Sequence, residues 1–315
     1  MEIINKHKLK NFADELEESV EKHNTKYRDE VISSIAQVEK YFSENLNKTV
    51  LILDNDLKIE IDSKPLNELI YEYLNMMRWI GWGNCQLSPA LKVKPGNEYS
   101  YAMIVYLSAR LIDDAIDGHT DYKNLIKTFY ASLLLKVNER EAAGLCTMAG
   151  NLVYNSALKL MYKNGYNESA GNLIQLYSEV IPGALTEAFT KGNKDYNLYS
   201  KIIQRKSVSY DMMLNKVFLR TVNEKLRTNL EKLLAGFSET AQWLNDLMDY
   251  EDDKERNQLN VLNCSGISQY SIYGKIALSF YDTWINAKEF NKDLQNSIAA
   301  RLIDPVNKLI NYELN

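Results

Sequence analysis

Apolar residues recur at helical spacing along most of this 315-residue chain. In residues 8–46 this spacing predicts one or two amphipathic helices. The residues that carry it are Phe12, Leu16, Val20, Val31, Ile35, Val38 and Phe42. From Leu66 onward we expect seven or eight further helices, with breaks near 81–98, 118–122, 137–140, 164–166, 182–183, 192–196, 222–225 and 254–270. Pro182 is the only proline between Pro95 and Pro305, so few positions in this part of the sequence would interrupt a helix and the helices can be long. The fold class is therefore predicted to be all-α.

A strand signal is found in residues 49–62, where apolar and polar residues alternate around an Asp-Asn-Asp turn. This pattern predicts a small β-hairpin near 49–62. We expect residues 1–64 to form an N-terminal helical extension that includes the hairpin. Residues 65–315 hold no repeat or linker rich in Gly and Ser, so we expect them to form one α-helical domain.

Two acidic clusters lie far apart in these predicted helices. The first holds Asp113, Asp114 and Asp117, and the second runs from Gln242 to Asp253. With 3.6 residues per turn, Asp113 and Asp117 fall on one helix face. In the second cluster the residues at successive i+4 positions are Asn245, Asp249 and Asp253. Each cluster therefore presents a stripe of oxygen atoms.

Such stripes suit Mg²⁺, which takes one or two carboxylates together with phosphate oxygens of a substrate. A calcium loop of the EF-hand type needs a central glycine, whereas these acids lie among apolar residues with helical spacing. The alternative is a solvated acidic face, since 42 of the 315 residues are acidic. We favour the metal site because buried carboxylates are costly unless metal or hydrogen bonds compensate them. The two clusters together predict a magnesium clamp for a diphosphate.

The overall composition excludes several function classes. A net charge of −5 and scattered basic residues give no electrostatic footprint for nucleic acid, so we expect no such partner. No stretch approaches the roughly 18 uncharged apolar residues that span a bilayer, and the N-terminus has no secretory apolar region. We therefore expect no stable membrane insertion and a cytoplasmic location. The three cysteines are widely spaced and support neither a disulfide framework nor a zinc site.

The clusters resemble the motifs of a known family, the trans-isoprenyl diphosphate synthases and the class I terpene synthases that share their fold. The segment from Asp113 to Asp117 is similar to the first aspartate-rich motif, DDxxD, and Gln242 to Asp249 is similar to the second, QxxDDxxD. Lys206 resembles the lysine that contacts the allylic diphosphate. The likeness covers residues 66–300. It implies the isoprenoid synthase fold, a single helical bundle around a central active-site cavity.

The resemblance also implies a reaction, ligands and partners. We expect a magnesium-dependent enzyme that ionises an allylic prenyl diphosphate, binds three Mg²⁺ ions in one site, and forms a homodimer. The expected catalytic residues are Asp113, Asp114, Asp117, Lys206, Asn245 and Asp249. The expected metal ligands are Asp113, Asp114, Asp117, Asn245, Asp246, Asp249 and Asp253. The expected contacts of the substrate diphosphate are Arg205, Lys206, Gln242 and Lys254.

Two departures from the family pattern bear on the reaction. The segment from Gly83 to Leu91 resembles the family's GGKRLRPLL, but its cations are replaced by Cys85, Gln86 and Ser88. In chain-elongating relatives those cations hold the diphosphate of isopentenyl diphosphate, so their loss should weaken that second site. Asn245 replaces the first aspartate of the second motif, and its i, i+4, i+8 spacing resembles the NSE triad of terpene cyclases.

We therefore favour a prenyltransferase-like terpene synthase that cyclises one allylic diphosphate. The alternatives are chain elongation with isopentenyl diphosphate, prenyl transfer to another acceptor such as a peptide, and a helical partner without activity. Ser108 and Ala109, small residues one turn before the first aspartate, would leave room for a C15–C20 or longer diphosphate. Candidate residues for an apolar chamber that stabilises the carbocation are Tyr106, Tyr210, Met212, Met213, Phe237 and Trp243.

Overall fold

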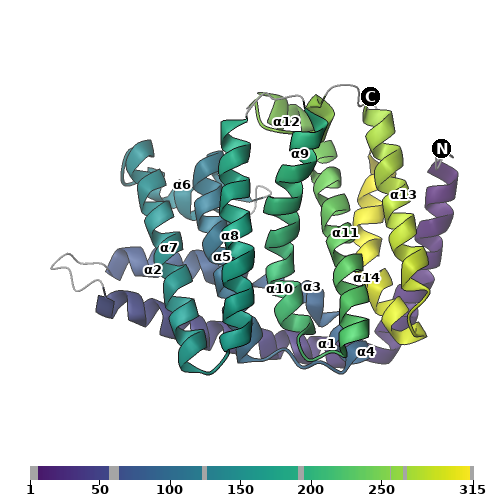
Figure 1. Cartoon of the computed structure of the whole chain (residues 1–315), viewed down its shortest axis with the longest axis horizontal. Coiled ribbons are helices and arrows are strands. Elements are labelled where there is room, and N and C mark those ends of the chain that lie inside the picture. The colour runs from purple at the N-terminus through teal and green to yellow at the C-terminus, as the bar shows by residue number, and fades with distance from the viewer. Residues whose placement is uncertain are drawn as a thin grey trace.

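Helices dominate the computed structural model, which describes residues 6–56, 64–122, 126–190, 195–255, 257–264 and 268–312. Most of the longer helices stand side by side as a bundle, and α12 lies across one end (Figure 1). The α-helices are α1 (Lys6–Asp56), α2 (Lys64–Met76), α3 (Trp82–Cys85), α4 (Ser88–Leu91), α5 (Asn97–Asp117), α6 (Phe129–Leu134), α7 (Glu139–Lys163), α8 (Asn167–Phe189), α9 (Tyr196–Ile203), α10 (Ser209–Leu219), α11 (Glu224–Met248), α12 (Tyr250–Glu255), α13 (Gln269–Ala287) and α14 (Lys292–Asn311). Shorter turns with other hydrogen-bond spacing are η1 (Met77–Gly81), η2 (Gln204–Val208) and η3 (Val261–Asn263). The predicted all-α class is confirmed.

Short polar side chains cap the N-termini of several of these helices. Thr128 accepts a hydrogen bond from Ala131 N at 3.1 Å at the start of α6, and Asn138 accepts one from Glu141 N at 3.0 Å at the start of α7. Such caps satisfy backbone N–H groups that have no partner within the first turn. At the other end of a helix, Gly118 stops α5 with a φ of 69°, a conformation that favours glycine.

The N-terminal helix α1 is one continuous element, 51 residues long. It runs along the base of the bundle and rises beside α14 (Figure 1). Leu16 in its first half and Phe42 in its second half are both fully buried, and both belong to the main apolar core. An ion pair of 2.7 Å between Lys26 and Asp293 joins α1 to α14.

The hairpin prediction for 49–62 is wrong over residues 49–56, which continue α1, while 57–62 lie outside the described residues. Within the helix, the Thr49 hydroxyl donates to the Asn45 carbonyl at 2.8 Å. A short apolar run fits either a helix or a strand, and here the buried positions Leu46 and Thr49 follow the helical period of α1. The strands that the structure does contain are β1 (Asp121–Tyr122) and β2 (Ile126–Lys127), an antiparallel pair that follows α5.

The break predicted near 182–183 is also wrong, because α8 continues through Pro182. The carbonyl of Pro182 accepts the Thr186 hydroxyl at 2.7 Å, one turn further along. The next residue, Gly183, lies against η2, where a Cβ atom would be 2.8 Å from Lys206 N. The missing side chain therefore lets α8 pass directly against the backbone of Lys206.

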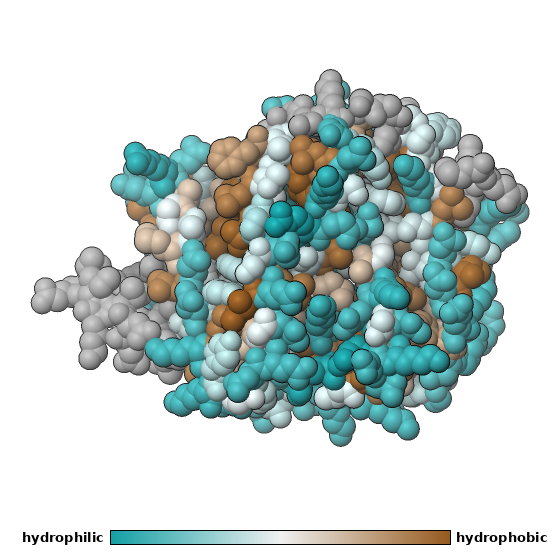
Figure 2. Space-filling model, in the orientation of Figure 1, coloured by the Kyte–Doolittle hydropathy of each residue, from teal (hydrophilic) through white to brown (hydrophobic). Residues whose placement is uncertain are grey.

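The surface is uneven in hydropathy. In the orientation of Figure 1, the lower edge formed by α1 is mostly hydrophilic, whereas apolar side chains reach the surface in strips over α7 and α8 (Figure 2). The exposed apolar residues of these two helices include Met148, Tyr162, Ile174, Leu185 and Phe189. In the described ranges, none of the helices combines the length and the apolar content needed to cross a membrane.

Candidate active site

The first aspartate segment occupies the last turn of α5. Asp113 and Asp117 line a polar cavity that is described below, whereas Asp114 is almost fully buried. The Tyr73 hydroxyl donates to Asp114 Oδ2 at 2.5 Å, and Arg110 Nε lies 2.9 Å from Asp114 Oδ1. Burial raises the pKa of Asp114, against the opposing effect of Arg110. The C-terminal end of a helix carries partial negative charge, so the helix dipole and these carboxylates both attract cations to this place.

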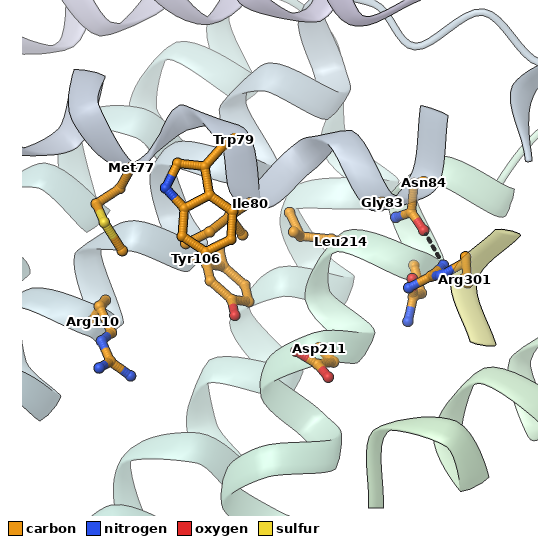
Figure 3. Close-up of a pocket in the computed structure, with 11 residues that line it drawn as sticks. Met77, Trp79, Ile80, Gly83, Asn84, Tyr106, Arg110, Asp211, Leu214 and Arg301 are labelled. Carbon is orange, nitrogen blue, oxygen red and sulfur yellow. Dashed lines mark hydrogen bonds between the residues drawn. The ribbon is translucent and has the colours of Figure 1, made fainter. Parts of the chain in front are cut away.

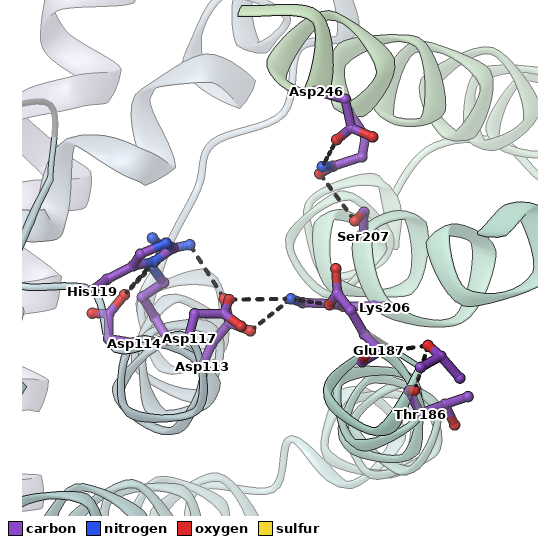
Figure 4. Close-up of polar contacts among 12 residues, drawn as sticks. Asp113, Asp114, Asp117, His119, Thr186, Glu187, Lys206, Ser207 and Asp246 are labelled. Carbon is purple, nitrogen blue, oxygen red and sulfur yellow. Dashed lines mark hydrogen bonds and ion pairs between the residues drawn. The ribbon is translucent and has the colours of Figure 1, made fainter. Parts of the chain in front are cut away.

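Lys206 projects from η2 into the space between three carboxylates (Figure 4). Its Nζ lies 2.9 Å from Asp113 Oδ1 and 3.6 Å from Asp117 Oδ2, and it also pairs with Glu187 of α8. Burial lowers the pKa of Lys206, but the carboxylates outweigh burial and hold that pKa well above its usual range. Burial likewise raises the pKa of Asp113, and Lys206 with Arg110 holds it below the usual value. Lys206 is therefore a fixed cation beside the first aspartate segment.

The second cluster lines the opposite part of the same cavity. Asn245, Asp249 and Asp253 all lie along its wall, as their i+4 spacing predicts. The chain bends at Asp249, where α11 has ended and α12 has not begun, yet the hydrogen bonds of the helical period persist. Asp249 N donates to Asn245 O at 2.8 Å, and Asp253 N donates to Asp249 O at 2.9 Å. Asn260 Nδ2 donates to Asp253 Oδ2 at 2.8 Å and so fixes the end of the stripe.

Asp246 is held on the inner side of the second cluster. Its carboxylate accepts hydrogen bonds from the Tyr199 hydroxyl at 2.8 Å, Val261 N at 2.9 Å and Gln242 Nε2 at 2.7 Å. The Ser207 hydroxyl in turn donates to Gln242 Oε1 at 3.1 Å (Figure 4). Burial raises the pKa of Asp246 to about 7, although all three donors oppose that rise. Asp246 thus joins α11 to α9, η2 and η3, and Gln242 shares in the connection.

Both clusters open onto one cavity of about 540 Å³. Its polar wall holds Asp113, Asp117, Glu187, Lys206, Gln242, Asn245, Asp246, Asp249 and Asp253. Its apolar wall includes Ile112, Val180, Ile181, Ala184 and the stacked rings of Tyr106 and Tyr210, whose centroids are 3.7 Å apart. Of the residues proposed for an apolar chamber, Tyr106 and Tyr210 therefore line this cavity, and so does Ala109. Met212, Met213, Phe237 and Trp243 are not among its lining residues.

Two cations expected at the diphosphate lie elsewhere. Arg205 is half-exposed and pairs with Glu179 at 2.7 Å, and Lys254 lies 4.0 Å from Glu251 on the surface of α12. Neither residue lines the cavity. Of the two cations in η2, Lys206 lines the cavity and Arg205 does not.

Most of the possible metal ligands around the cavity are oxygen atoms of carboxylates and amides, which Mg²⁺ prefers, and the imidazole of His119 also lines it. Among the described residues, no three side chains of the types His, Cys, Asp and Glu converge closely enough to hold a metal ion by themselves. Mg²⁺ commonly takes few protein ligands and completes its shell with water and substrate phosphate. Asp113, Asp117, Asn245, Asp249 and Asp253 are the residues that would hold it.

Several site residues escaped the sequence interpretation. Glu187 was missed because a single acid in an apolar helix belongs to no recognisable motif. Arg110 precedes Asp113 and Asp114 by three and four residues, a spacing that brings opposite charges together on a helix. Tyr73 and Asn260 reach the aspartates from distant parts of the chain, so no local pattern reveals them.

Comparisons with known proteins place the fold. No family model and no curated protein matches the sequence. Solved structures do match over nearly their whole length. A polyprenyl synthase from Caulobacter crescentus, solved with calcium and isoprenyl diphosphate, has a TM-score of 0.64 and 10% identity, and the match covers 93% of this chain and 98% of that one.

Two further structures agree. A geranyltranstransferase from Thermotoga maritima has a TM-score of 0.60 at 11% identity, with 84% of this chain and 98% of that chain covered. A geranyltransferase from Helicobacter pylori, solved with magnesium and isoprenyl diphosphate, has a TM-score of 0.55 at 14% identity, with coverage of 84% and 96%. The chain therefore has the fold of the trans-isoprenyl diphosphate synthases.

Proposed function

We propose that this chain ionises an allylic prenyl diphosphate with the help of Mg²⁺ and transfers the prenyl group to an acceptor. The observation that carries the proposal is the meeting of two oxygen-rich stripes, from α5 and α11, across one cavity that also holds the buried cation Lys206. The structural neighbours are prenyl-transferring enzymes by their titles, and two of them were solved with a divalent metal and isoprenyl diphosphate. The fold and the donor set thus support the same chemistry.

The residues of the cavity would have different roles in the proposed reaction. Bound Mg²⁺ would neutralise charge on the leaving diphosphate. Lys206 would donate hydrogen bonds to the same group, in a site where a preorganised cation needs no rearrangement as charge develops. Tyr106, Tyr210 and Ile112 would surround the prenyl chain, exclude water and present aromatic faces to the allylic cation.

Cyclisation of the same cation is the second candidate. It is favoured by the neutral segment after Gly83, where Cys85 and Ser88 are buried and the Gln86 side chain is hydrogen-bonded to His23 at 3.2 Å. None of these three side chains lines the active-site cavity. A cyclase needs no second diphosphate, so it would not need cations in this segment.

A product assay tests both functions. The protein is incubated with Mg²⁺ and C10, C15, C20 or C25 allylic diphosphates, with and without isopentenyl diphosphate, and both released diphosphate and extracted products are measured. Asp113→Ala or Asn245→Ala should reduce diphosphate release about a thousandfold, because metal stabilisation of the leaving group contributes several kcal/mol. Glu251→Ala, on the exposed face of α12, is the control and should keep full activity. Full turnover in Asp113→Ala would refute the proposed site.

Terpenes formed without isopentenyl diphosphate would assign cyclisation. Longer prenyl diphosphates formed only in its presence would assign chain elongation.

A further inference from the structure

A second cavity of about 230 Å³ adjoins the active site. Tyr106, Arg110 and Asp211 belong to the walls of both cavities. The remaining walls combine apolar and aromatic residues with polar side chains, and Figure 3 shows Trp79, Tyr106 and Leu214 in the middle of the group. The residues that line only the second cavity are Met77, Trp79, Ile80, Gly83, Asn84, Leu214, Asn215 and Arg301. A molecule held here would lie next to the apolar chamber of the active site.

The two cations of this second cavity are separated and engaged. Arg110 lies against Asp113 and Asp114, at 3.4 and 2.9 Å. Arg301 donates to Asn84 Oδ1 at 2.7 Å and is close enough to Asp211 to be stabilised by its charge. In Figure 3 the two guanidinium groups lie on opposite sides of the cavity, with the aromatic residues between them. They do not converge on one point, as a diphosphate would require.

The neutral segment supplies no further charge. Only Gly83 and Asn84 of this segment reach the second cavity. Cys85 and Ser88 are buried away from it, and Gln86 is bonded to His23. An anion with several charges is very costly to bury where cations do not meet it, whereas an uncharged aromatic ring with one polar group suits walls that mix aromatic and apolar side chains with the amides of Asn84 and Asn215.

We propose that the second cavity binds an uncharged aromatic acceptor with one O–H or N–H group, to which the prenyl group is transferred; this inference rests on the proposed function. The bond between C1 of the prenyl group and the diphosphate oxygen breaks, and its electron pair leaves with the diphosphate. The acceptor donates an electron pair to C1 and forms the new bond. The proton of the acceptor passes to the carboxylate of Asp211.

Asp211 is suited to that task by its position. It lies in the wall between the two cavities, on α10, next to the aromatic pair of Tyr106 and Tyr210. Burial raises the pKa of Asp211, against the opposing effects of the Ser238 hydroxyl and Arg301. A carboxylate in an apolar wall accepts a proton more readily than one in water.

Binding is tested with phenol as the probe, by saturation-transfer NMR on the full chain without any diphosphate. Leu214→Trp fills the second cavity and should abolish the phenol signal, and Ile80→Phe should do so too if Leu214→Trp folds poorly. The control is Ile174→Trp, a change of similar size on the exposed side of α8, which should keep the signal. A phenol signal that is absent from the wild type, or unchanged in both filled variants, would overturn the inference.

Transfer is tested with Mg²⁺, farnesyl diphosphate and phenol, by measuring the ratio of prenylated phenol to released diphosphate. The ratio should fall about tenfold or more in Leu214→Trp, since the acceptor is no longer held beside C1. Asp211→Asn should also lower it, and this loss should diminish at high pH, where phenol loses its own proton. Diphosphate release without prenylated phenol in the wild type would refute the inference and leave the proposed function standing. No diphosphate release with any allylic diphosphate would refute the proposed function itself.

Discussion

Lys206 Nζ lies 2.9 Å from Asp113 Oδ1, and this pair joins η2 to the last turn of α5. A metal ion bound to Asp113 would have to share that carboxylate with the ammonium group or displace it. Glu187, on the other side of Lys206, offers the ammonium group a second anionic partner. The balance between these two carboxylates should therefore set how readily the site takes up magnesium.

Glu187→Gln should raise the Mg²⁺ concentration needed for half-maximal diphosphate release by about fivefold. Without the Glu187 charge, Lys206 would stay closer to Asp113 and Asp117, and a change of about 1 kcal/mol in this competition corresponds to that factor. The matched control is Glu179→Gln, on the same helix, which pairs with the half-exposed Arg205. An identical magnesium dependence in the wild type and Glu187→Gln would contradict the competition.

Gly183→Ala should destabilise the protein by about 1–3 kcal/mol and lower its activity. Its new Cβ atom would lie 2.8 Å from the backbone nitrogen of Lys206, so α8 and η2 would have to separate. Gly171→Ala tests the same change on the same helix, where nothing lies within 4 Å, and it should stabilise the protein by about 0.5–1 kcal/mol. Urea unfolding of the two variants measures both effects. Equal stabilities for the two variants would show that the close approach at Gly183 is not required.

Asp246→Ala should lower the free energy of unfolding by about 2–4 kcal/mol. The change would leave the Tyr199 hydroxyl, Val261 N and the Gln242 amide without their shared acceptor in a buried place. Glu251→Ala, an exposed acid on α12, should change the stability by less than about 0.5 kcal/mol. If Asp246→Ala unfolded at the same urea concentration as the wild type, the joining role of Asp246 would be excluded.

The contribution of His23 to the stability should fall as the pH drops below about 6.5. This side chain is buried between α1 and α14, with Nδ1 3.2 Å from the Ser297 hydroxyl, and burial lowers its pKa below 6.5. The unfolded chain therefore takes up a proton at a pH where the folded chain does not, which favours unfolding by up to about 1.4 kcal/mol per pH unit. The measurement is the free energy of unfolding between pH 5 and 8.

His23→Gln should remove this part of the pH dependence, whereas His7→Gln, at the exposed start of α1, should keep it. An unchanged slope in His23→Gln would assign the acid sensitivity to other groups.

The helices and both aspartate stripes could be predicted from the sequence because their signals are local. The i+4 spacing of Asp113 and Asp117, and of Asn245, Asp249 and Asp253, places each set on one helix face, and all five line one cavity. Lys206 was found through its resemblance to a family lysine, and the structure brings it to Asp113.

What could not be predicted depends on contacts between distant segments. Residues 49–56 alternate like a strand but continue α1, since burial of Leu46 and Thr49 outweighs the local pattern. Gly183 offers no sign in the sequence that it touches Lys206, and nothing in the sequence distinguishes Asp246, which is fixed by three hydrogen bonds, from the other acids of the cavity wall. The donors that fix Asp246 include Tyr199 and Val261, which lie 47 and 15 residues away in the sequence.

The packing of α1 on α14 also constrains how the protein is made. Helix α1 leaves the ribosome long before α14, on which it mainly packs, has been synthesised. Across that contact Lys26 pairs with Asp293 and His23 with Ser297. At about 5–20 residues per second, the apolar face around Leu16 stays uncovered for roughly 15–60 s. Nascent chains that stall before α14 should therefore be prone to aggregation or capture by chaperones, and a short deletion within α14 should reduce the yield of folded protein more than an equally short deletion in an exposed loop.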